Sequence, residues 1–313
     1  MSTPVSETRR AGLAATGEQY RIAAGPYRAV VTEVGAGLRE LTHDDEPLIL
    51  THDEDEVAPA AFGQLLVPWP NRVDHGRYTW DGAEHVLDID EPEYDCAIHG
   101  LVRWSTWREV ERAPDRVSLA TRLLGSPGYP FRLDVTAEYV LDETHGLTIT
   151  MTAGNHGRVA APYGHGAHPY LTVGEPIDDC IVQIPGDLYL PVDDRMIPPG
   201  PPRPVEGTGY DLRAGRRLGP LEIDRAFTDL HRDDAGRAWV HLGGMNRRAS
   251  FWLDHTHPWL EVYTADDVPP ALRRTGLGVE PMTCPPNAFA SGVDVVRLEP
   301  GATHTGSWGI LAG

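Results

Sequence analysis

The sequence predicts an all-β protein, a large antiparallel β-sandwich, and three observations lead to this prediction. Apolar residues recur with a period of two along much of the chain, as they do in half-buried strands. No long segment keeps its apolar positions at the spacing of an amphipathic helix. The 33 Gly and 28 Pro residues interrupt most stretches that would otherwise continue as helices.

At the N-terminus we expect residues 1–17 to form a flexible tail, followed by a single domain over residues 18–313. The pair Arg9-Arg10 resembles a twin-arginine export signal, but the apolar stretch after it is too short for one. All-β folds of this length occur as one domain. Strand-like sequence continues on both sides of the Pro- and Gly-rich segment 191–217, so we expect a long surface loop there, of the kind that rims a site.

Alternating sequence predicts hairpins. Residues 131–139 and 147–153 alternate apolar with polar side chains, and residues 142–146 break the pattern as a turn does. The dipeptide Asp81-Gly82 tolerates the positive φ angles of a type I′ turn. Two further hairpins are therefore predicted, one between residues 77–80 and 84–88 and one between residues 106–112 and 116–124.

The charge balance restricts the partners. The chain has 46 Asp and Glu residues against 27 Lys and Arg residues, a net charge of -19. A protein this acidic repels phosphate backbones and anionic membrane surfaces, so we expect neither a nucleic acid nor a membrane as partner. No apolar run reaches the length that crosses a bilayer. With these two partners excluded, we expect a small-molecule partner.

The cysteines indicate a reducing compartment. Cys96, Cys180 and Cys284 are far apart and odd in number, and none belongs to a Cys-x-x-Cys pair. Neither a disulfide framework nor a thiolate zinc site is indicated. We therefore expect a cytoplasmic protein. The acid and base chemistry described below requires no cofactor.

Three residues form the candidate proton-transfer group. Glu280 is a single carboxylate held between rigid backbone elements, which makes it the best candidate for a catalytic base. His99 precedes a glycine that would let a ligand approach the backbone, although a histidine that caps a turn fits the same pattern. His168 lies in a Gly-rich segment. A carboxylate with two imidazoles indicates proton transfer on a small polar molecule.

The Gly-rich segment holds a second histidine, His165, three residues before His168. In an extended chain, residues three apart point to opposite faces, so only one of the two enters a cleft. A zinc site that uses them with His255 or His257 has no His-Glu-x-x-His spacing to support it. We therefore expect no metal.

Other polar and aromatic residues have open roles. The Arg72 guanidinium, next to Asn71, is suited either to bind ligand hydroxyls or to order a neighbouring carboxylate. Asp224 and Asp229 compete as the acidic residue that contacts a substrate, and surface charge is the alternative for both. Three aromatic residues are suited to stack on a sugar or to fill the core: Trp252, Trp259 and Tyr263.

In order along the chain, several motifs resemble those of the aldose 1-epimerase, or mutarotase, family. They cover most of the sequence. The motifs are Asn71-Arg72 followed by Gly76-Arg77-Tyr78-Thr79-Trp80-Asp81-Gly82, then Ile98-His99-Gly100, Gly166-Ala167-His168-Pro169-Tyr170, Asp224-Arg225-Ala226-Phe227, Val279-Glu280-Pro281 and Pro285-Pro286-Asn287-Ala288-Phe289.

The resemblance implies a β-sandwich with an open sugar-binding cleft, and it implies roles for matching positions. Glu280 would be the general base, His168 the general acid, and His99 a hydrogen-bond partner near the reacting ring. The expected substrate-binding residues are Asn71, Arg72, Arg103, Tyr170 and Asp224. Leu101 replaces the second glycine that other members carry after His-Gly, so the chain resembles a divergent branch.

The expected activity is interconversion of the α and β anomers of a free hexose or related aldose. One alternative is an epimerase of an anionic sugar, a 6-phospho or 6-sulfo hexose, whose anion would meet Arg103 or the arginines of segment 203–217. Another is a carbohydrate-binding protein without turnover. A glycoside hydrolase would instead need two carboxylates that flank the scissile bond.

Overall fold

The computed structural model describes residues 13–313, and its strands form two large antiparallel sheets and one smaller sheet. The widest sheet has nine strands, in the order β10 (Arg108–Ala113), β11 (Arg116–Leu123), β12 (Leu133–Asp142), β13 (Gly146–Asn155), β27 (Thr303–Ala312), β23 (Arg248–Leu253), β22 (Ala238–Gly243), β17 (Ile181–Gln183) and β20 (Arg216–Arg217). The predicted all-β antiparallel sandwich is confirmed.

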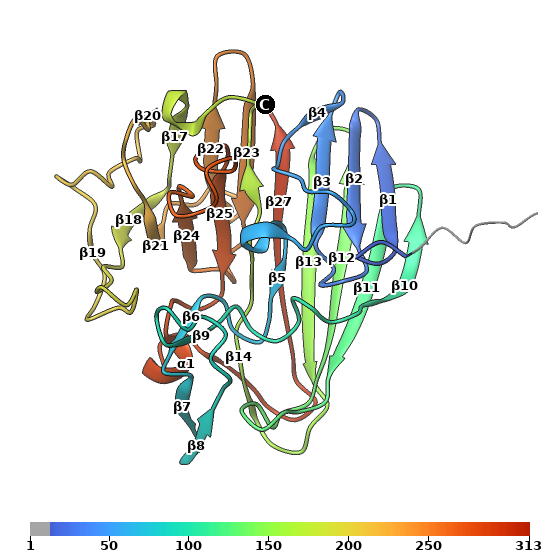
Figure 1. The fold of residues 1–313 in the computed structure, drawn as a ribbon, viewed down its shortest axis with the longest axis vertical. Helices are drawn as coiled ribbons and strands as arrows, with labels where there is room; N and C mark the ends of the chain where they lie inside the picture. The colour runs from blue at the N-terminus through green and yellow to red at the C-terminus, as the bar shows by residue number, and fades with distance from the viewer. Residues whose placement is uncertain (1–12) are drawn as a thin grey trace, which may run out of the picture.

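Two other sheets lie over this one (Figure 1). The four-stranded sheet contains β1 (Gln19–Ala24), β2 (Tyr27–Thr32), β3 (Leu38–His43) and β4 (Glu46–Pro47), and it contacts β11 and β12. The eight-stranded sheet has the order β19 (Arg203–Pro204), β18 (Gly186–Tyr189), β21 (Asp224–Leu230), β24 (Trp259–Tyr263), β25 (Leu277–Met282), β15 (Gly166–Ala167) and β5 (Leu65–Leu66), with β16 (Tyr170–Leu171) also on β25.

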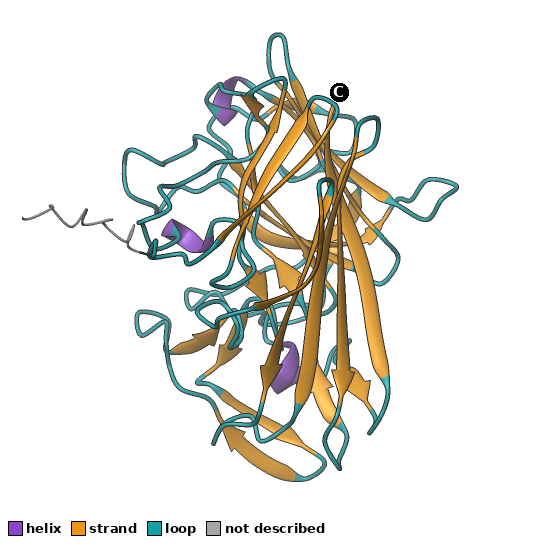
Figure 2. Cartoon of the chain, turned by 90° about the vertical axis from the view of Figure 1, so that its right-hand side faces the viewer, coloured by secondary structure: helices purple, strands orange, loops and turns teal. Residues whose placement is uncertain are grey.

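The remaining elements are short. Three strand pairs are separate: β6 (Arg72–Asp74) with β9 (Cys96–Ile98), β7 (Arg77–Trp80) with β8 (Ala83–Val86), and β14 (Ala161–Tyr163) with β26 (Val296–Leu298). Within residues 13–313 the helical elements are η1 (Pro59–Ala61), η2 (Ile177–Asp179) and α1 (Ala288–Ser291) (Figure 2). No helix in this part of the chain is long and apolar enough to span a membrane.

The predicted hairpins are confirmed. In β12 and β13, Ala137 lies opposite Met151 and Tyr139 opposite Ile149, and these side chains are buried while the residues between them are not. The β7–β8 turn has positive φ at both Asp81 (48°) and Gly82 (80°), as a type I′ turn requires. Strands β10 and β11 pair as expected.

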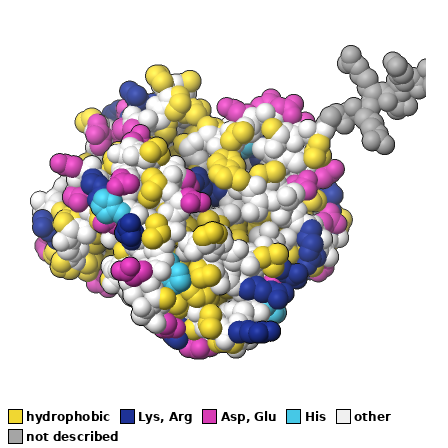
Figure 3. Space-filling view, turned by 60° about the horizontal axis from the view of Figure 1, so that its bottom comes forward, with side chains coloured by type: hydrophobic (Ala, Val, Ile, Leu, Met, Phe, Trp, Pro, Cys, Tyr) yellow, Lys and Arg dark blue, Asp and Glu magenta, His cyan; other side chains and the backbone are white. Residues whose placement is uncertain are grey.

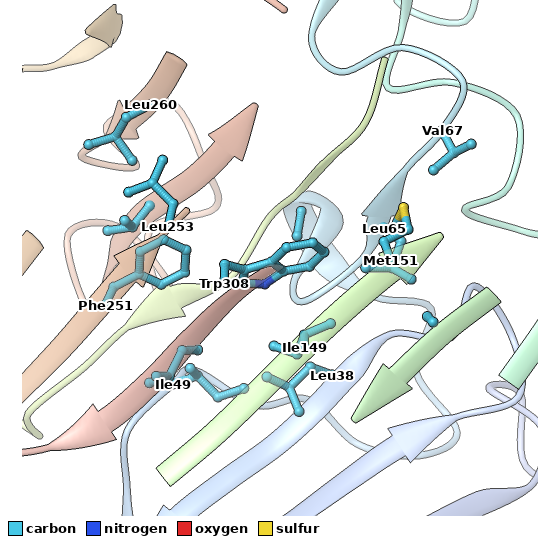
Figure 4. Packing of buried hydrophobic residues seen from close by; sticks show 14 of the residues in the cluster. Leu38, Ile49, Leu65, Val67, Ile149, Met151, Phe251, Leu253, Leu260 and Trp308 are labelled. Atoms are coloured by element: carbon cyan, nitrogen blue, oxygen red, sulfur yellow. The ribbon is translucent and has the colours of Figure 1, made fainter. Parts of the chain in front are cut away.

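The main core lies between the sheets, where one buried cluster draws residues from Tyr20 to Ile310. Trp308 of β27 is fully buried at its centre, with Phe251 and Leu253 on one side and Ile149 on the other (Figure 4). This core covers one face of the eight-stranded sheet. The other face is therefore available for polar groups.

Alternation along β25 assigns side chains to the two faces of the eight-stranded sheet. Leu277 and Val279 join the main core, so Glu280 points to the opposite, outer face. The same rule holds on β24, where Leu260 and Val262 enter the core. The outer face thus receives the polar residues of both strands.

Three other expectations concern the N-terminal tail, the cysteines and the net charge. Thr16, placed by sequence in the flexible tail, is buried and hydrogen-bonds to the backbone of Glu54, while residues 1–12 lie outside the described residues. The three cysteines are free and buried. Figure 3 shows acidic, basic and apolar side chains mixed over one face, which suits the interpretation of the net charge as a solvated surface.

Candidate active site

A cavity of about 220 Å³ lies on the outer face of the eight-stranded sheet. All eight residues predicted from the sequence line it, namely Asn71, Arg72, His99, Arg103, His168, Tyr170, Asp224 and Glu280. Ala60, Ala61, Glu91, Ile98, Tyr263 and Asp267 complete the lining. Segment 191–217 contributes none of these lining residues, which contradicts the expectation that it rims the site.

Glu280 and His168 meet at the base of the cavity. Oε1 of Glu280 lies 3.2 Å from Nε2 of His168, and both residues are buried. Burial raises the pKa of Glu280 well above its usual range and lowers the pKa of His168 to about 3. Both shifts disfavour a carboxylate beside an imidazolium in this pair. The remaining polar atoms, Oε2 of Glu280 and Nδ1 of His168, have no hydrogen-bond partner among the described residues.

His99 is held in one tautomer by the backbone. The backbone N–H of Asn71 donates to Nδ1 of His99 over 3.2 Å. Burial, and after it the charge of His168, lowers the pKa of His99 well below its usual range, so the ring is neutral. Because Nδ1 accepts, Nε2 carries the hydrogen. His99 therefore offers a neutral N–H donor at the cavity wall.

The glycine after His99 has a different role from the one expected. Gly100 has a φ of 73°, and a Cβ there would lie 2.1 Å from the carbonyl oxygen of Val67. The close approach that this glycine allows in the structure is to the backbone of Val67. A side chain at position 100 would clash with that carbonyl group and would be strained at this positive φ.

Arg72 orders a neighbouring carboxylate, one of the two roles left open by the sequence. Its Nε and Nη2 donate to Oε2 and Oε1 of Glu91, each over 2.7 Å, and its guanidinium lies 4.9 Å from the ring centroid of Tyr94. Glu91 was missed in the sequence because it is 19 residues away and belongs to no motif. The bidentate pair fixes the plane of Arg72 at the cavity edge.

Arg103 also lines the cavity and has its own carboxylate. Its Nη2 donates to Asp90 over 3.1 Å and to the carbonyl oxygen of Ile98 over 3.2 Å. Its Nε is buried without a partner among the described residues. The arginines of segment 203–217 line no part of this cavity, so only Arg103 of the proposed anion contacts is in place.

Only some of the acidic and aromatic candidates line the cavity. Asp224 lines the cavity, whereas Asp229 is exposed outside it. Of the three aromatic residues, Tyr263 reaches the cavity, while Trp252 and Trp259 are buried elsewhere. Tyr170 donates its hydroxyl to the carbonyl oxygen of Ala60, and its ring stacks on His168 at 5.0 Å.

His165 lies on the opposite side of the segment from His168, inside the core. Its Nε2 is 2.9 Å from Nε2 of His257, and its Nδ1 is 3.0 Å from the hydroxyl of Tyr163. His257 in turn contacts Asp254 through Nδ1 at 2.9 Å. Within residues 13–313 no group of three or more His, Cys, Asp and Glu residues is arranged to hold a metal ion.

The fold and the polar cavity on its outer face define a galactose mutarotase-like β-sandwich protein. The sequence model described as aldose 1-epimerase matches residues 18–310, and the chain belongs to this family of isomerases. The uncharacterized protein YihR of Escherichia coli K12 is 36% identical over 291 residues, which cover 92% of this chain and 91% of YihR. Human galactose mutarotase is 30% identical over 215 residues, 65% of this chain and 59% of the human protein.

Solved structures show the same fold at low sequence identity. The GalM/aldose epimerase homologue from C. elegans superposes with a TM-score of 0.85 at 20% identity and covers 95% of this chain and 98% of its own. Galactose 1-epimerase from Lactobacillus acidophilus gives a TM-score of 0.78 at 22% identity, with 93% of each chain covered.

Proposed function

We propose that the protein interconverts the α and β anomers of a free aldose by acid and base catalysis. The observation that carries this proposal is the buried Glu280–His168 pair, with 3.2 Å between the two functional atoms. A cavity of about 220 Å³ is smaller than the roughly 300–1,000 Å³ of pockets for drug-sized ligands, so it suits a single sugar ring.

A single proton shared by Glu280 and His168 is enough to generate both the base and the acid. When it moves from Glu280 to Nε2 of His168, a carboxylate base and an imidazolium acid form without a change of net charge. Glu280 then accepts the proton of the anomeric hydroxyl, and His168 donates its proton to the ring oxygen. The C1–O5 bond breaks as the carbonyl forms at C1, the open chain rotates about C1–C2, and closure reverses the transfers.

The other lining residues orient the sugar. The neutral His99 supplies an N–H donor to an oxygen near the reacting centre, and the ordered Arg72 guanidinium is suited to donate to a hydroxyl. Asp224 supplies acceptor oxygens from β21, which is separated from the Glu280 strand by β24. Donors and acceptors on separate elements hold the ring in one orientation, so that the base and acid reach O1 and O5.

A sugar with an anionic group on C6 is the second candidate substrate. It is supported by Arg103, whose side chain lines the cavity. A guanidinium pairs well with a tetrahedral anion. Assays with a neutral hexose and with its 6-phosphate and 6-sulfonate analogues separate the two candidates, because an anion-selective site would equilibrate the charged sugars much faster.

The test of the proposed activity uses freshly dissolved α-glucose and α-galactose, with polarimetry to follow their equilibration. The purified protein should accelerate mutarotation and leave a matching aryl glycoside intact. Release of the aryl group would indicate a glycoside hydrolase instead. Saturable sugar binding without faster mutarotation of neutral or anionic sugars would indicate a carbohydrate-binding protein.

A further inference from the structure

A buried carboxyl group next to Glu280 has no part in the proposed proton transfers. Glu261 is in the middle of β24, only 3% exposed, on the outer face that also carries Glu280. The register places Glu261 directly opposite Glu280 on β25 and opposite Ala226 on β21. Asp224, two residues from Ala226, is therefore a diagonal neighbour on the same face.

The charges around Glu261 do not balance if all of these carboxyl groups are ionised. Glu280 lies directly opposite Glu261 on β25 and Asp224 lies diagonally on β21, while the positive charge of Arg72 on β6 acts to lower the pKa of Glu261. Arg72 is already engaged by the two oxygens of Glu91. Like charges directly opposite each other in a sheet are destabilising, and a buried carboxylate without a counterion is costly.

We propose that Glu261 is a neutral carboxylic acid that donates a hydrogen bond to Asp224, and so holds Asp224 as a fixed acceptor for a substrate hydroxyl. The register places the carboxyl groups of Glu261 and Asp224 on the same face of neighbouring strands as a diagonal pair. Two carboxylates cannot hydrogen-bond to each other, so a hydrogen bond within this pair requires a proton on one of them. The role of Asp224 in this inference rests on the proposed function.

The proton belongs on Glu261 for reasons of position. Glu261 is the more deeply buried of the two and faces Glu280 directly. Burial raises the pKa of Asp224 as well, but Asp224 is only partly buried and also feels the positive charge of Arg225. Oε2 of Glu261 is buried without a partner among the described residues, which is tolerable for a neutral carbonyl oxygen and costly for a charged one. Burial first, and then the charges of Asp224 and Glu280, raise the pKa of Glu261 well above its usual range.

A neutral Glu261 also favours ionisation of Glu280, the proposed base. An ionised Glu261 would oppose formation of the Glu280 carboxylate directly across the strand pair. A neutral Glu261 removes that repulsion. Glu261 is thus a positioning residue that acts through Asp224 and Glu280 and does not itself touch the sugar.

The protonation state is tested by stability, without reference to activity. The unfolded chain ionises Glu261 near pH 4.5, while the folded chain keeps the proton to higher pH. The native state therefore binds one more proton, and its stability falls as the pH rises above 4.5. Glu261→Gln removes this proton uptake, so the Tm of the variant minus that of the wild type should increase as pH rises from about 4.5 towards the folded pKa.

A matched control is Glu84→Gln, at an exposed position of β8. Its Tm difference from the wild type should not increase with pH. A flat difference for Glu261→Gln as well would show that Glu261 is ionised in the folded protein, which would overturn the inference.

The positioning role is tested by rate against pH. At neutral pH Glu261→Gln should retain the wild-type kcat within about threefold, because the amide still donates to Asp224, whereas Glu261→Ala should lose about tenfold. At alkaline pH the wild type should slow as Glu261 ionises, and Glu261→Gln should not. Equal losses in the Gln and Ala variants would show that the carboxylate itself is needed.

The outcomes separate this inference from the proposed function. If the wild type fails to anomerise any free aldose, the proposed function is wrong, while the Tm series still decides whether Glu261 is protonated. If Glu261→Ala does not fold, the comparison between the wild type and Glu261→Gln over pH still tests both parts.

Discussion

Two histidines three residues apart occupy opposite environments in this protein. His168 faces the cavity with Glu280, and His165 lies in the core with His257. Both rings are buried, and burial lowers the pKa of each. Burial alone therefore does not distinguish a reactive histidine from a structural one.

The difference lies in what their nitrogens contact. Both ring nitrogens of His165 have hydrogen-bond partners. The hydrogen-bonded series continues from His257 to Asp254, so both ring nitrogens of His257 have partners as well. At the cavity, Nδ1 of His168 and Oε2 of Glu280 have no partner among the described residues. Buried polar groups are nearly always hydrogen-bonded, so these two atoms distinguish the surroundings of His168 from those of His165.

The largest effect on the mutarotation rate is expected from a change at the cavity. His168→Asn keeps a polar side chain but cannot act as an acid, so mutarotation should fall by roughly 10²-fold or more. Polarimetry with α-galactose measures it, and circular dichroism checks the fold. A rate close to that of the wild type would remove His168 from the mechanism.

The matched change in the core should act on stability instead. His165→Asn breaks the contact with His257 and leaves buried polar groups unpaired, at a cost of about 1–3 kcal/mol in the free energy of unfolding. Urea unfolding measures this loss, and kcat should stay within a few-fold of wild type. If His165→Asn damaged turnover more than His168→Asn while both variants fold, the assignment of the two histidines would be reversed.

The same core network predicts acid sensitivity. Burial first, and then nearby charge, lowers the pKa of His165 in the folded state, so below about pH 6.5 the unfolded chain binds more protons than the native state. Stability is thus present above pH 6.5 and is lost as pH falls, by up to about 1.4 kcal/mol per pH unit for each such histidine. Urea unfolding between pH 8 and 5 should show a weaker dependence for His165→Asn than for wild type. Equal slopes would mean that His165 titrates alike in both states.

The smallest expected effect concerns metal. The proposed steps need only the carboxyl group of Glu280 and the imidazole of His168, so extensive dialysis against a chelator should leave anomerisation unchanged. Loss of activity that only added zinc restores would assign a metal role to one of the two histidines. It would contradict the metal-free role proposed for His168.

Much of the fold followed from local pattern. The β12–β13 hairpin could be predicted because one buried face imposes a period of two, and the Asp81-Gly82 turn because few dipeptides accept two positive φ angles. All eight proposed site residues line one cavity, although they come from five regions of the chain. Their catalytic and binding roles stay predictions.

Contacts between distant residues could not be read from the sequence. Glu91 holds Arg72 from 19 residues away, and His165 meets His257 across 92 residues. Glu261 reads as an ordinary polar strand residue until the register sets it opposite Glu280. The arginine-rich segment 203–217 has the composition of an anion site but lies away from the cavity, because composition does not fix where a loop packs.

The central claim is that Glu280 takes the anomeric proton. Glu280→Gln keeps the size of the side chain and most of its hydrogen bonding but cannot accept that proton. Exchange between the α and β anomers of a free aldose, measured by NMR at saturating sugar with equal amounts of wild type and variant, tests this directly. We expect a fall of roughly 10²-fold or more with sugar binding retained. Exchange at the wild-type rate in the folded variant would contradict it.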